Sequence, residues 1–336
     1  MPNATCSSQK RRARQGIVRS LFLVALALVL IRPCVAQERS YPAGPIRFIV
    51  GAPPGGPIDV AARLLGPYFQ AILGQSSVVE NRAGAGGIIA TRAVAAAAPD
   101  GLTVLSAANS MLATEKANNK AGYNVERDLI PIFSIGWTPN IIVASPALPV
   151  SSLKELIELS RTRDLNYGTI GRGTTTHLMT EYLLQHAAHT KIQHIPYPGS
   201  AAALTAVAGN HIDIACVAMI AAVPLVQANQ IKAIAVTSSR RVEALAEVPT
   251  LTEAGFPGYD YVTWVGFFMP AKTPSATVEI FRNVALKTLA MKEVREKLLA
   301  LGFEPEVVFG DQFRMQVSTE LVHWGEVVAK TGIKAE

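Results

Sequence analysis

Short apolar runs alternate with segments of helical periodicity along almost the whole chain, and this alternation limits the folds open to it. Short, unbroken apolar runs fit strands that are buried on both faces. Strands that alternate with helices predict an α/β fold, in which helices cover both faces of a mostly parallel sheet. We expect strands at 46–50, 77–80, 102–106, 141–145, 165–168, 192–195, 212–217, 231–237 and 262–268. We expect helices at 59–73, 86–98, 151–161, 175–188, 200–208, 221–228, 275–301 and 311–330.

Two strand-like segments flanked by prolines divide this pattern into two parts. They read TPNIIVASPALPV at 138–150 and YVTWVGFFMPAKTP at 261–274. If the chain crosses between lobes at both segments, the first lobe comprises 41–138 plus 264–336 and the second comprises 139–263. The sequence therefore predicts two α/β lobes, each a mostly parallel sheet flanked by helices, joined by two hinge crossings.

The first 36 residues have the composition of a secretory signal peptide. Five basic residues lie in the first 19 positions, and the eleven residues 21–31 are all apolar. Small residues at Cys34 and Ala36 are spaced as a cleavage site requires. A transmembrane anchor is disfavoured, because a helix needs about 20 apolar residues to cross a bilayer. We expect export, with cleavage near Ala36.

The net positive charge of the chain comes from this leading segment. The chain has 31 Lys and Arg and 25 Asp and Glu, and six of the basic residues lie within 1–36. The remaining 25 basic residues balance the 25 acidic ones, so no excess of positive charge favours nucleic-acid binding. Cleavage near Ala36 leaves Cys216 as the single cysteine, so no intramolecular disulfide can form.

Three glycine-containing loops each follow an expected strand and precede an expected helix. They read PPGGPID at 53–59, TIGRGTTTH at 169–177 and YPGSAAA at 197–203. Free N–H groups and the helix dipole at a helix start attract anions, and ligands of open α/β sheets bind at the carboxyl ends of strands. The loops therefore indicate an anion site shared by both lobes. Plain turns remain an alternative, with Asp59 as the N-cap of its helix.

The motifs of common enzymes are missing from the sequence. GAGGII at 84–89 lacks the third glycine of a dinucleotide-binding loop, and the loop at 169–177 lacks a P-loop lysine. The sequence contains neither G-x-S-x-G nor H-E-x-x-H. The cluster of His186, His189 and His194 is more typical of a polar rim than of a metal site, and Cys216 of an inert core thiol. We expect no catalytic residue, no cofactor and no metal.

The sequence closely resembles the Bug-type periplasmic solute-binding receptors of the tripartite tricarboxylate transporter family. The resemblance extends over essentially all of 41–336, and ENRAGAGG followed by APDG is one of its specific blocks. It implies a type II-like periplasmic binding protein fold that closes on one small organic carboxylate, with membrane transporter subunits as transient partners. The implied ligand-binding residues are Gly55, Gly56, Ile58, Asp59, Gly171, Gly173, Thr174, Thr175 and His177. We also expect Arg172, Tyr197 and Gly199, from the same three loops, to bind the ligand.

The chain departs from the family pattern at several positions. Arg172 stands where family members commonly have Asn, and Val217 and Ala218 stand where they often have Asp-Asn. These changes predict a more apolar pocket with a cation on one anion loop. Gly66-Pro67 predicts a kink or an early end in the first helix. We expect a monomeric receptor. A periplasmic sensor that feeds a signalling partner and a secreted enzyme using the same cleft are the rival interpretations.

Overall fold

The computed structural model describes residues 41–118, 120–259 and 261–334, apart from the side chain of residue 186. The strands are β1 (Ile46–Val50), β2 (Ser77–Asn81), β3 (Thr103–Ala108), β4 (Leu129–Ala144), β5 (Asn166–Thr169), β6 (Gln193–Pro196), β7 (Ile214–Ala218), β8 (Lys232–Val236), β9 (Val262–Pro270) and β10 (Val308–Phe309). The helices are α2 (Pro57–Leu73), α3 (Ile88–Ala95), α4 (Ser110–Ala117), α5 (Val125–Asp128), α6 (Leu153–Leu159), α7 (Thr175–Glu181), α8 (Ser200–Ala208), α9 (Met219–Gln227), α10 (Ser275–Ala290), α11 (Lys292–Ala300) and α12 (Gly310–Thr331). Short 3₁₀ turns are η1 (Ala85–Gly87) and η3 (Glu243–Leu245), and η2 (Tyr182–Ala187) is a π-helical turn that continues α7.

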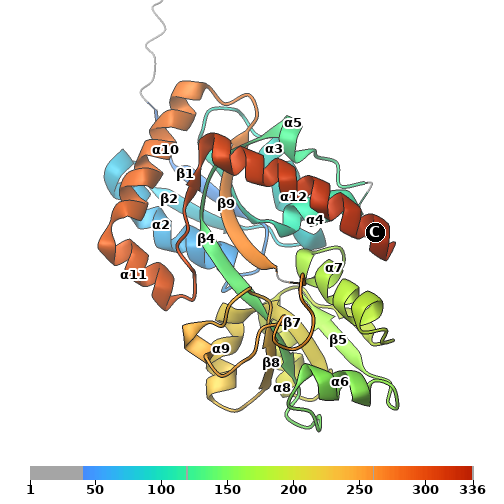
Figure 1. The fold of residues 1–336 in the computed structure, drawn as a ribbon. Helices are drawn as coiled ribbons and strands as arrows, with labels where there is room; N and C mark the ends of the chain where they lie inside the picture. Colours follow the sequence, from blue (N-terminus) through green and yellow to red (C-terminus); the bar gives the residue numbers. More distant parts are fainter. Residues whose placement is uncertain (1–40, 119, 260, 335–336) are drawn as a thin grey trace, which may run out of the picture. The chain divides into compact units, whose positions relative to one another are not determined.

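The strands form two sheets that share β4. Sheet A contains β2, β1, β3, β9 and β4, with β10 paired to β4, and sheet B contains β4, β7, β5 and β6, with β8 paired to β4. The pairs β1–β2, β1–β3, β5–β6 and β5–β7 are parallel, as expected for strands joined by helical crossovers. Every antiparallel pair includes β4 or β9, the strands of the two predicted crossings. Figure 1 shows β4 running from the elements of sheet A to those of sheet B.

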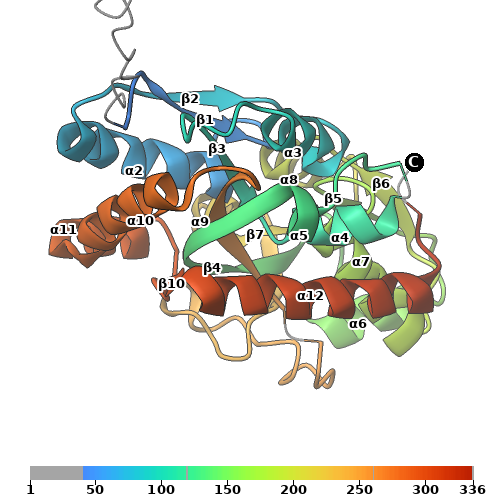
Figure 2. The same ribbon diagram turned by 90° about the horizontal axis from the view of Figure 1, so that it is seen from above.

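Helices cover both faces of sheet A, and the alternation of strand side chains explains why. Phe48 of β1 and Phe267 of β9 pack on the side of α2, α10 and α11, whereas their neighbours Ile49 and Phe268 pack on the side of α3, α4 and α12. Figure 2 shows α2, α10 and α11 together, with α12 lying along β4. Both faces are therefore apolar, which accounts for the unbroken apolar runs of the sequence.

Sheet B is built in the same way. Cys216 of β7 packs with residues of α6 and η2, and its neighbour Val217 packs with residues of α8 and α9. The structure is a mixed α/β fold in which each sheet lies between helices. The predicted boundaries of the two lobes, 41–138 plus 264–336 and 139–263, stay a prediction.

β4 changes its register against β9 at two places, and one of them is filled by another part of the chain. At Gly136 the backbone φ is +129°, and a Cβ there would lie 2.2 Å from the carbonyl oxygen of Glu304. The amide of Trp137 donates to that carbonyl at 3.1 Å, and the amide of Glu304 donates to the carbonyl of Trp137 at 2.8 Å. Arg240, from the loop after β8, forms an ion pair with Glu304 at 2.7 Å. Glycine is required at 136 because this segment lies directly on the strand.

Every predicted strand is present, and the main differences concern helices. The helix predicted at 275–301 is interrupted at Met291, whose ψ of 128° is extended, so α10 and α11 are separate. The sequence analysis missed α4, where Met111, Leu112 and Ala113 are consecutive and all buried, so no amphipathic stripe marks the helix. It also missed α5 and the first half of β4.

The prediction of an early end at Gly66-Pro67 is wrong. α2 continues through Pro67 to Leu73, where Gly74 ends it in the left-handed conformation. A proline inside a helix costs about 3 kcal/mol. The residues beyond it offset this cost, because Phe69 is fully buried and its ring lies 4.7 Å from that of Phe281.

None of the described helices is long and apolar enough to cross a membrane. The signal peptide and the cleavage near Ala36 lie outside the described residues.

Candidate functional site

A cavity of about 660 Å³ opens where the strands of both sheets meet their following loops. Its volume falls within the range of roughly 300–1,000 Å³ that small-molecule sites occupy. Nine of the twelve predicted site residues line it, namely Gly55, Gly56, Ile58, Gly171, Arg172, Thr174, Thr175, Tyr197 and Gly199. Asp59, Gly173 and His177 do not line it and lie behind its wall. Contact of any of these residues with a ligand stays a prediction.

The first loop joins β1 to α2 and is held by a buried carboxylate. The helix begins at Pro57 with Gly56 as its N-cap, so the alternative that placed Asp59 at the N-cap is wrong. Proline suits this first position because its missing N–H would have no partner there. The carboxylate of Asp59 instead accepts the amide of Gly55 at 3.0 Å, which fixes Gly55 at a φ of +87°.

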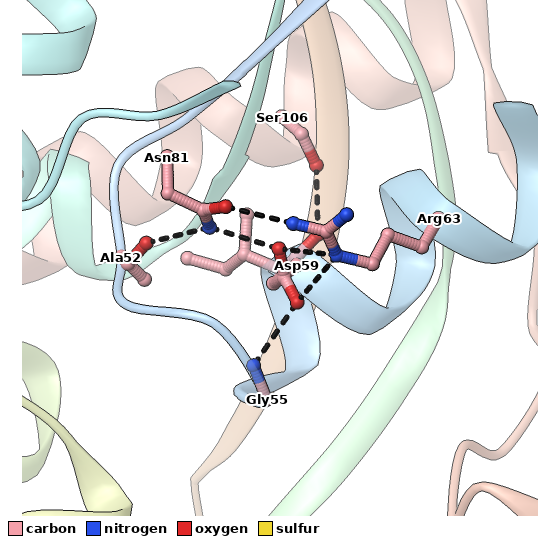
Figure 3. A network of polar contacts seen from close by, with 7 residues as sticks. Ala52, Gly55, Asp59, Arg63, Asn81 and Ser106 are labelled. Atoms are coloured by element: carbon pink, nitrogen blue, oxygen red, sulfur yellow. Dashed lines mark hydrogen bonds and ion pairs between the residues drawn. The ribbon is translucent and has the colours of Figure 1, made fainter. Parts of the chain in front are cut away.

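Asp59 is the centre of the polar network in Figure 3. It accepts a hydrogen bond from the Nε of Arg63 at 3.0 Å and one from the side-chain amide of Asn81 at 2.8 Å. The Asn81 amide also donates to the carbonyl of Ala52, on the same loop. Burial raises the pKa of Asp59, but the bonds from Arg63, Gly55 and Asn81 outweigh it and hold the pKa below its ordinary value. Asp59 is therefore ionised and positions the loop.

The second loop joins β5 to α7 and contains Arg172. Gly171 and Gly173 adopt φ values of +136° and +76°, which favour glycine. Thr174 is the N-cap residue, and its hydroxyl donates to the carbonyl of Gly171 at 2.7 Å. These constraints direct the loop around Arg172, whose side chain is exposed within the cavity lining.

His177 supports this loop from behind. Its Nδ1 accepts the amide of Gly173 at 3.0 Å, so the proton of the neutral ring lies on Nε2. Its ring stacks on His194 with centroids 3.8 Å apart. Burial, with the neighbouring His194 and Arg172, lowers the pKa of His177 to about 3, and burial with Arg172 lowers the pKa of His194 to about 4. Both rings are neutral near pH 7.

The third loop, between β6 and α8, touches the first loop across the cavity. Gly199 is extended, and a Cβ there would lie 3.3 Å from the Cγ of Pro53. A similar approach occurs beside it, where a Cβ on Gly86 would lie 3.5 Å from the Cγ2 of Thr174. The loops after β1 and β2 therefore lie against the loops after β6 and β5.

The loop after β2, which carries Gly84, Gly86 and Gly87, is the part of the wall that the sequence analysis missed. All three glycines have positive φ, and Gly87 is the N-cap of α3. The same order of strand, glycines and helix that marked the other loops could have identified it.

The electrostatic character of the wall is positive at these loops. α2, α3, α7 and α8 all begin at the cavity, and a helix start carries roughly half a positive charge. Of the described residues that line the cavity, Arg172 is the only charged one, and none is an Asp or Glu. The site can therefore hold an anion.

The remaining wall is mainly carbon. Its apolar side chains are Leu105, Ala107, Ala108, Met111, Ile170, Ala218 and Ala221. Ala218 lines the cavity as the predicted departure from the family pattern requires, whereas Val217 packs in the core of sheet B. Asn140 of β4 and Thr263 of β9 also reach the cavity and are hydrogen-bonded to each other at 3.0 Å.

The described residues offer neither a grouped set of metal ligands nor an accessible thiol. Within the described residues, no three His, Cys, Asp or Glu side chains are grouped to hold a metal ion. Cys216 is buried with its Sγ 2.9 Å from the Tyr261 hydroxyl, and burial raises the pKa of the thiol.

Comparisons with known proteins agree with this geometry. Residues 61–333 match the family TctC, described as tripartite tricarboxylate transporter family receptor. BugT of Bordetella pertussis is 35% identical over 299 residues, which cover 88% of this chain and 91% of BugT. The periplasmic binding protein BugD has a TM-score of 0.82 and 29% identity, covering 88% of this chain and all of BugD. Rpa4515 of R. palustris, solved with adipate, has a TM-score of 0.83 and 31% identity, covering 88% of this chain and 99% of Rpa4515.

Proposed function

This chain belongs to the tripartite tricarboxylate transporter receptor family, and from that premise we propose that it captures a small organic carboxylate in its cavity and delivers it to a membrane transporter. The chain acts in the periplasm after removal of residues 1–36, as a monomer and without catalysis. The membrane partner is a transporter of the tripartite tricarboxylate class, which engages the loaded receptor transiently.

One observation supports this proposal most directly. Four helix starts and Arg172 line a single cavity, and none of its described lining residues is an Asp or Glu. A carboxylate placed there accepts hydrogen bonds from backbone N–H groups that have no intrahelical partner. Arg172 can add a bidentate pair to the same group, which is among the stronger polar interactions in proteins.

We propose that the two sides of the cavity close on the ligand, because each side supplies some of the binding groups. Gly55 and Gly56 belong to the side of sheet A, whereas Arg172, Thr174 and Gly199 belong to the side of sheet B. A ligand that contacts both sides stabilises the closed arrangement, because the open one loses part of its contacts. The crossing strands β4 and β9 act as the hinge about which the sides separate.

The first test is identification of the ligand that accompanies the receptor. Protein purified from the periplasm is examined by native mass spectrometry and then by calorimetric titration with any carboxylate found. We expect one carboxylate per chain and a smaller radius of gyration in X-ray scattering when it is bound. Failure of every carboxylate tested to bind, or tight binding without compaction, would refute capture by closure.

The transport step needs a separate test in the source organism. A strain that lacks the gene should lose uptake of the identified carboxylate, and the wild-type gene should restore it. Normal uptake in the deletion strain, combined with a lost transcriptional response to the ligand, would instead favour the sensor.

A further inference from the structure

We propose that the cavity selects a monocarboxylate with an apolar body, and that it discriminates against both a second carboxylate and an ammonium group. This inference rests on the proposed function and names the class of ligand. It depends on how the charges around the cavity are distributed, which is a property of this chain's own side chains.

The positive groups lie together at one part of the wall. Arg172 lies between Gly171 and Gly173 on the loop that begins α7. Gly199 lies against Pro53 and Gly86 lies against Thr174, so the loops that begin α8 and α3 approach the loops that begin α2 and α7. A carboxylate held between such loops accepts from more than one helix start.

Among the described residues of the wall, Arg172 is the only cation, and the neighbouring arginines are engaged elsewhere, so a second carboxylate would lack a partner. Arg63 donates to Asp59 and Asn81, and Arg82 forms an ion pair with Glu80 at 3.1 Å. Arg92 donates to the backbone carbonyls of Ala121 and Lys120. Burial of a carboxylate without a paired charge is unfavourable by several kcal/mol, so the second group lowers affinity.

An ammonium group would find no anion. Asp59 is the acidic residue next to the first loop, and its oxygens accept from Gly55, Arg63 and Asn81 behind the wall. An amino-acid ligand would instead place its ammonium group near Arg172 and four helix starts. This arrangement disfavours amino acids relative to the same acids without the amino group.

The rest of the wall favours a hydrocarbon body. Leu105 and Met111 of sheet A's side and Ile170, Ala218 and Ala221 of sheet B's side present apolar surface. Each buried CH₂ group of a ligand contributes about 0.8 kcal/mol. A chain or ring of several carbons therefore adds affinity without any further polar contact.

A series of six-carbon compounds tests this inference by calorimetry at pH 7.5. Hexanoate, adipate and L-norleucine share a chain length and differ only by the added carboxylate or amino group. We expect hexanoate to bind at least 10-fold more tightly than either of the others. The same preference should hold for 3-phenylpropionate over L-phenylalanine.

A variant provides the matched control. Ala221→Lys places a cation on the apolar wall, so it should strengthen adipate binding and bring its affinity close to that of hexanoate. A thermal unfolding curve like that of wild type shows that the variant folds.

The outcomes separate this inference from the proposed function. Adipate or norleucine binding as tightly as hexanoate overturns the selection while a carboxylate receptor stands. Binding of none of the five compounds, together with no carboxylate in the native mass spectrum, overturns both.

Discussion

Replacement of Asp59 by Ala tests how a side chain behind the wall controls the site. Asp59 is 2% exposed and accepts hydrogen bonds from three partners, so its removal leaves Gly55, Asn81 and Arg63 without their acceptor. A hydrogen bond to a charged group is worth about 1.5–3 kcal/mol. The three partners contribute unequally to the free energy of unfolding, because they differ in how exposed they are to water.

The side chain of Arg63 is 51% exposed, so its ion pair contributes only about 0–1 kcal/mol. Gly55 is also exposed, and water can replace part of its bond. The Asn81 amide keeps its bond to Ala52. We therefore expect Asp59→Ala to lower the free energy of unfolding by about 2–4 kcal/mol, and Asp59→Asn by less, because one acceptor oxygen remains.

The assay is urea unfolding at pH 7, combined with calorimetric titration of hexanoate. The Ala variant should bind more weakly, since Gly55 is no longer held in its left-handed conformation. Asp164→Ala, at an exposed carboxylate, and Arg63→Ala are the controls, and each should change stability by less than about 1 kcal/mol. Asp59→Ala with wild-type stability and wild-type affinity would show that the loop holds its shape without the carboxylate.

The pH dependence of this effect has a definite sign. The pKa of Asp59 lies below its ordinary value, so its contribution is present above the unfolded pKa of about 3.9 and is lost as the pH falls through the lower folded pKa. The stability difference between wild type and Asp59→Ala should therefore be constant from pH 5 to pH 8.

Three further changes test the other loops. Arg172→Ala should weaken hexanoate binding by about 10- to 150-fold in calorimetry. Arg172→Lys should recover only part of this affinity, because lysine lacks the planar guanidinium that pairs with both carboxylate oxygens. An Arg172→Ala affinity within twofold of wild type would show that Arg172 does not contact the ligand. Gly199→Val should collide with Pro53, lowering hexanoate affinity about 10-fold or more and preventing compaction in scattering, whereas unchanged compaction would argue against the contact. His177 has a folded pKa of about 3, so between that pH and about 6.5 the unfolded chain binds a proton there that the folded chain does not. This lowers stability by about 2 kcal/mol from pH 7 to pH 5, and His194, with a folded pKa of about 4, adds a similar fall. In urea unfolding His177→Gln should lose about half of the wild-type dependence, and an equal dependence in the variant would contradict the reasoning.

The sequence predicted most strands because buried strands carry a local signal. Each is a short apolar run between turn residues, so it can be recognised without its neighbours. The first half of β4 lacks this signal, since Pro131 and Gly136 resemble strand breakers. In the structure both residues lie at the shifts of register against β9, where a missing N–H or a positive φ is tolerated.

Whether each loop residue lines the cavity or lies behind its wall could not be predicted in the same way. A motif such as TIGRGTTTH identifies a loop, but adjacent residues of a loop can point to ligand or to core. Gly173 and His177 form a hydrogen bond behind the wall, whereas Arg172 and Thr174 line the cavity. The contact between Gly199 and Pro53 joins residues far apart in the sequence, so no local pattern reports it.

The continuous course of β4 also has a consequence for how the folded state comes apart. Residues 129–139 are hydrogen-bonded to β9 in sheet A, and residues 140–144 lie between β7 and β8 in sheet B. Loss of either sheet frees one half of β4, which the other sheet also uses, and exposes apolar surface along the strand. The two sheets should therefore melt in one calorimetric transition, and the amide hydrogens along β4 should exchange with solvent through the same global opening.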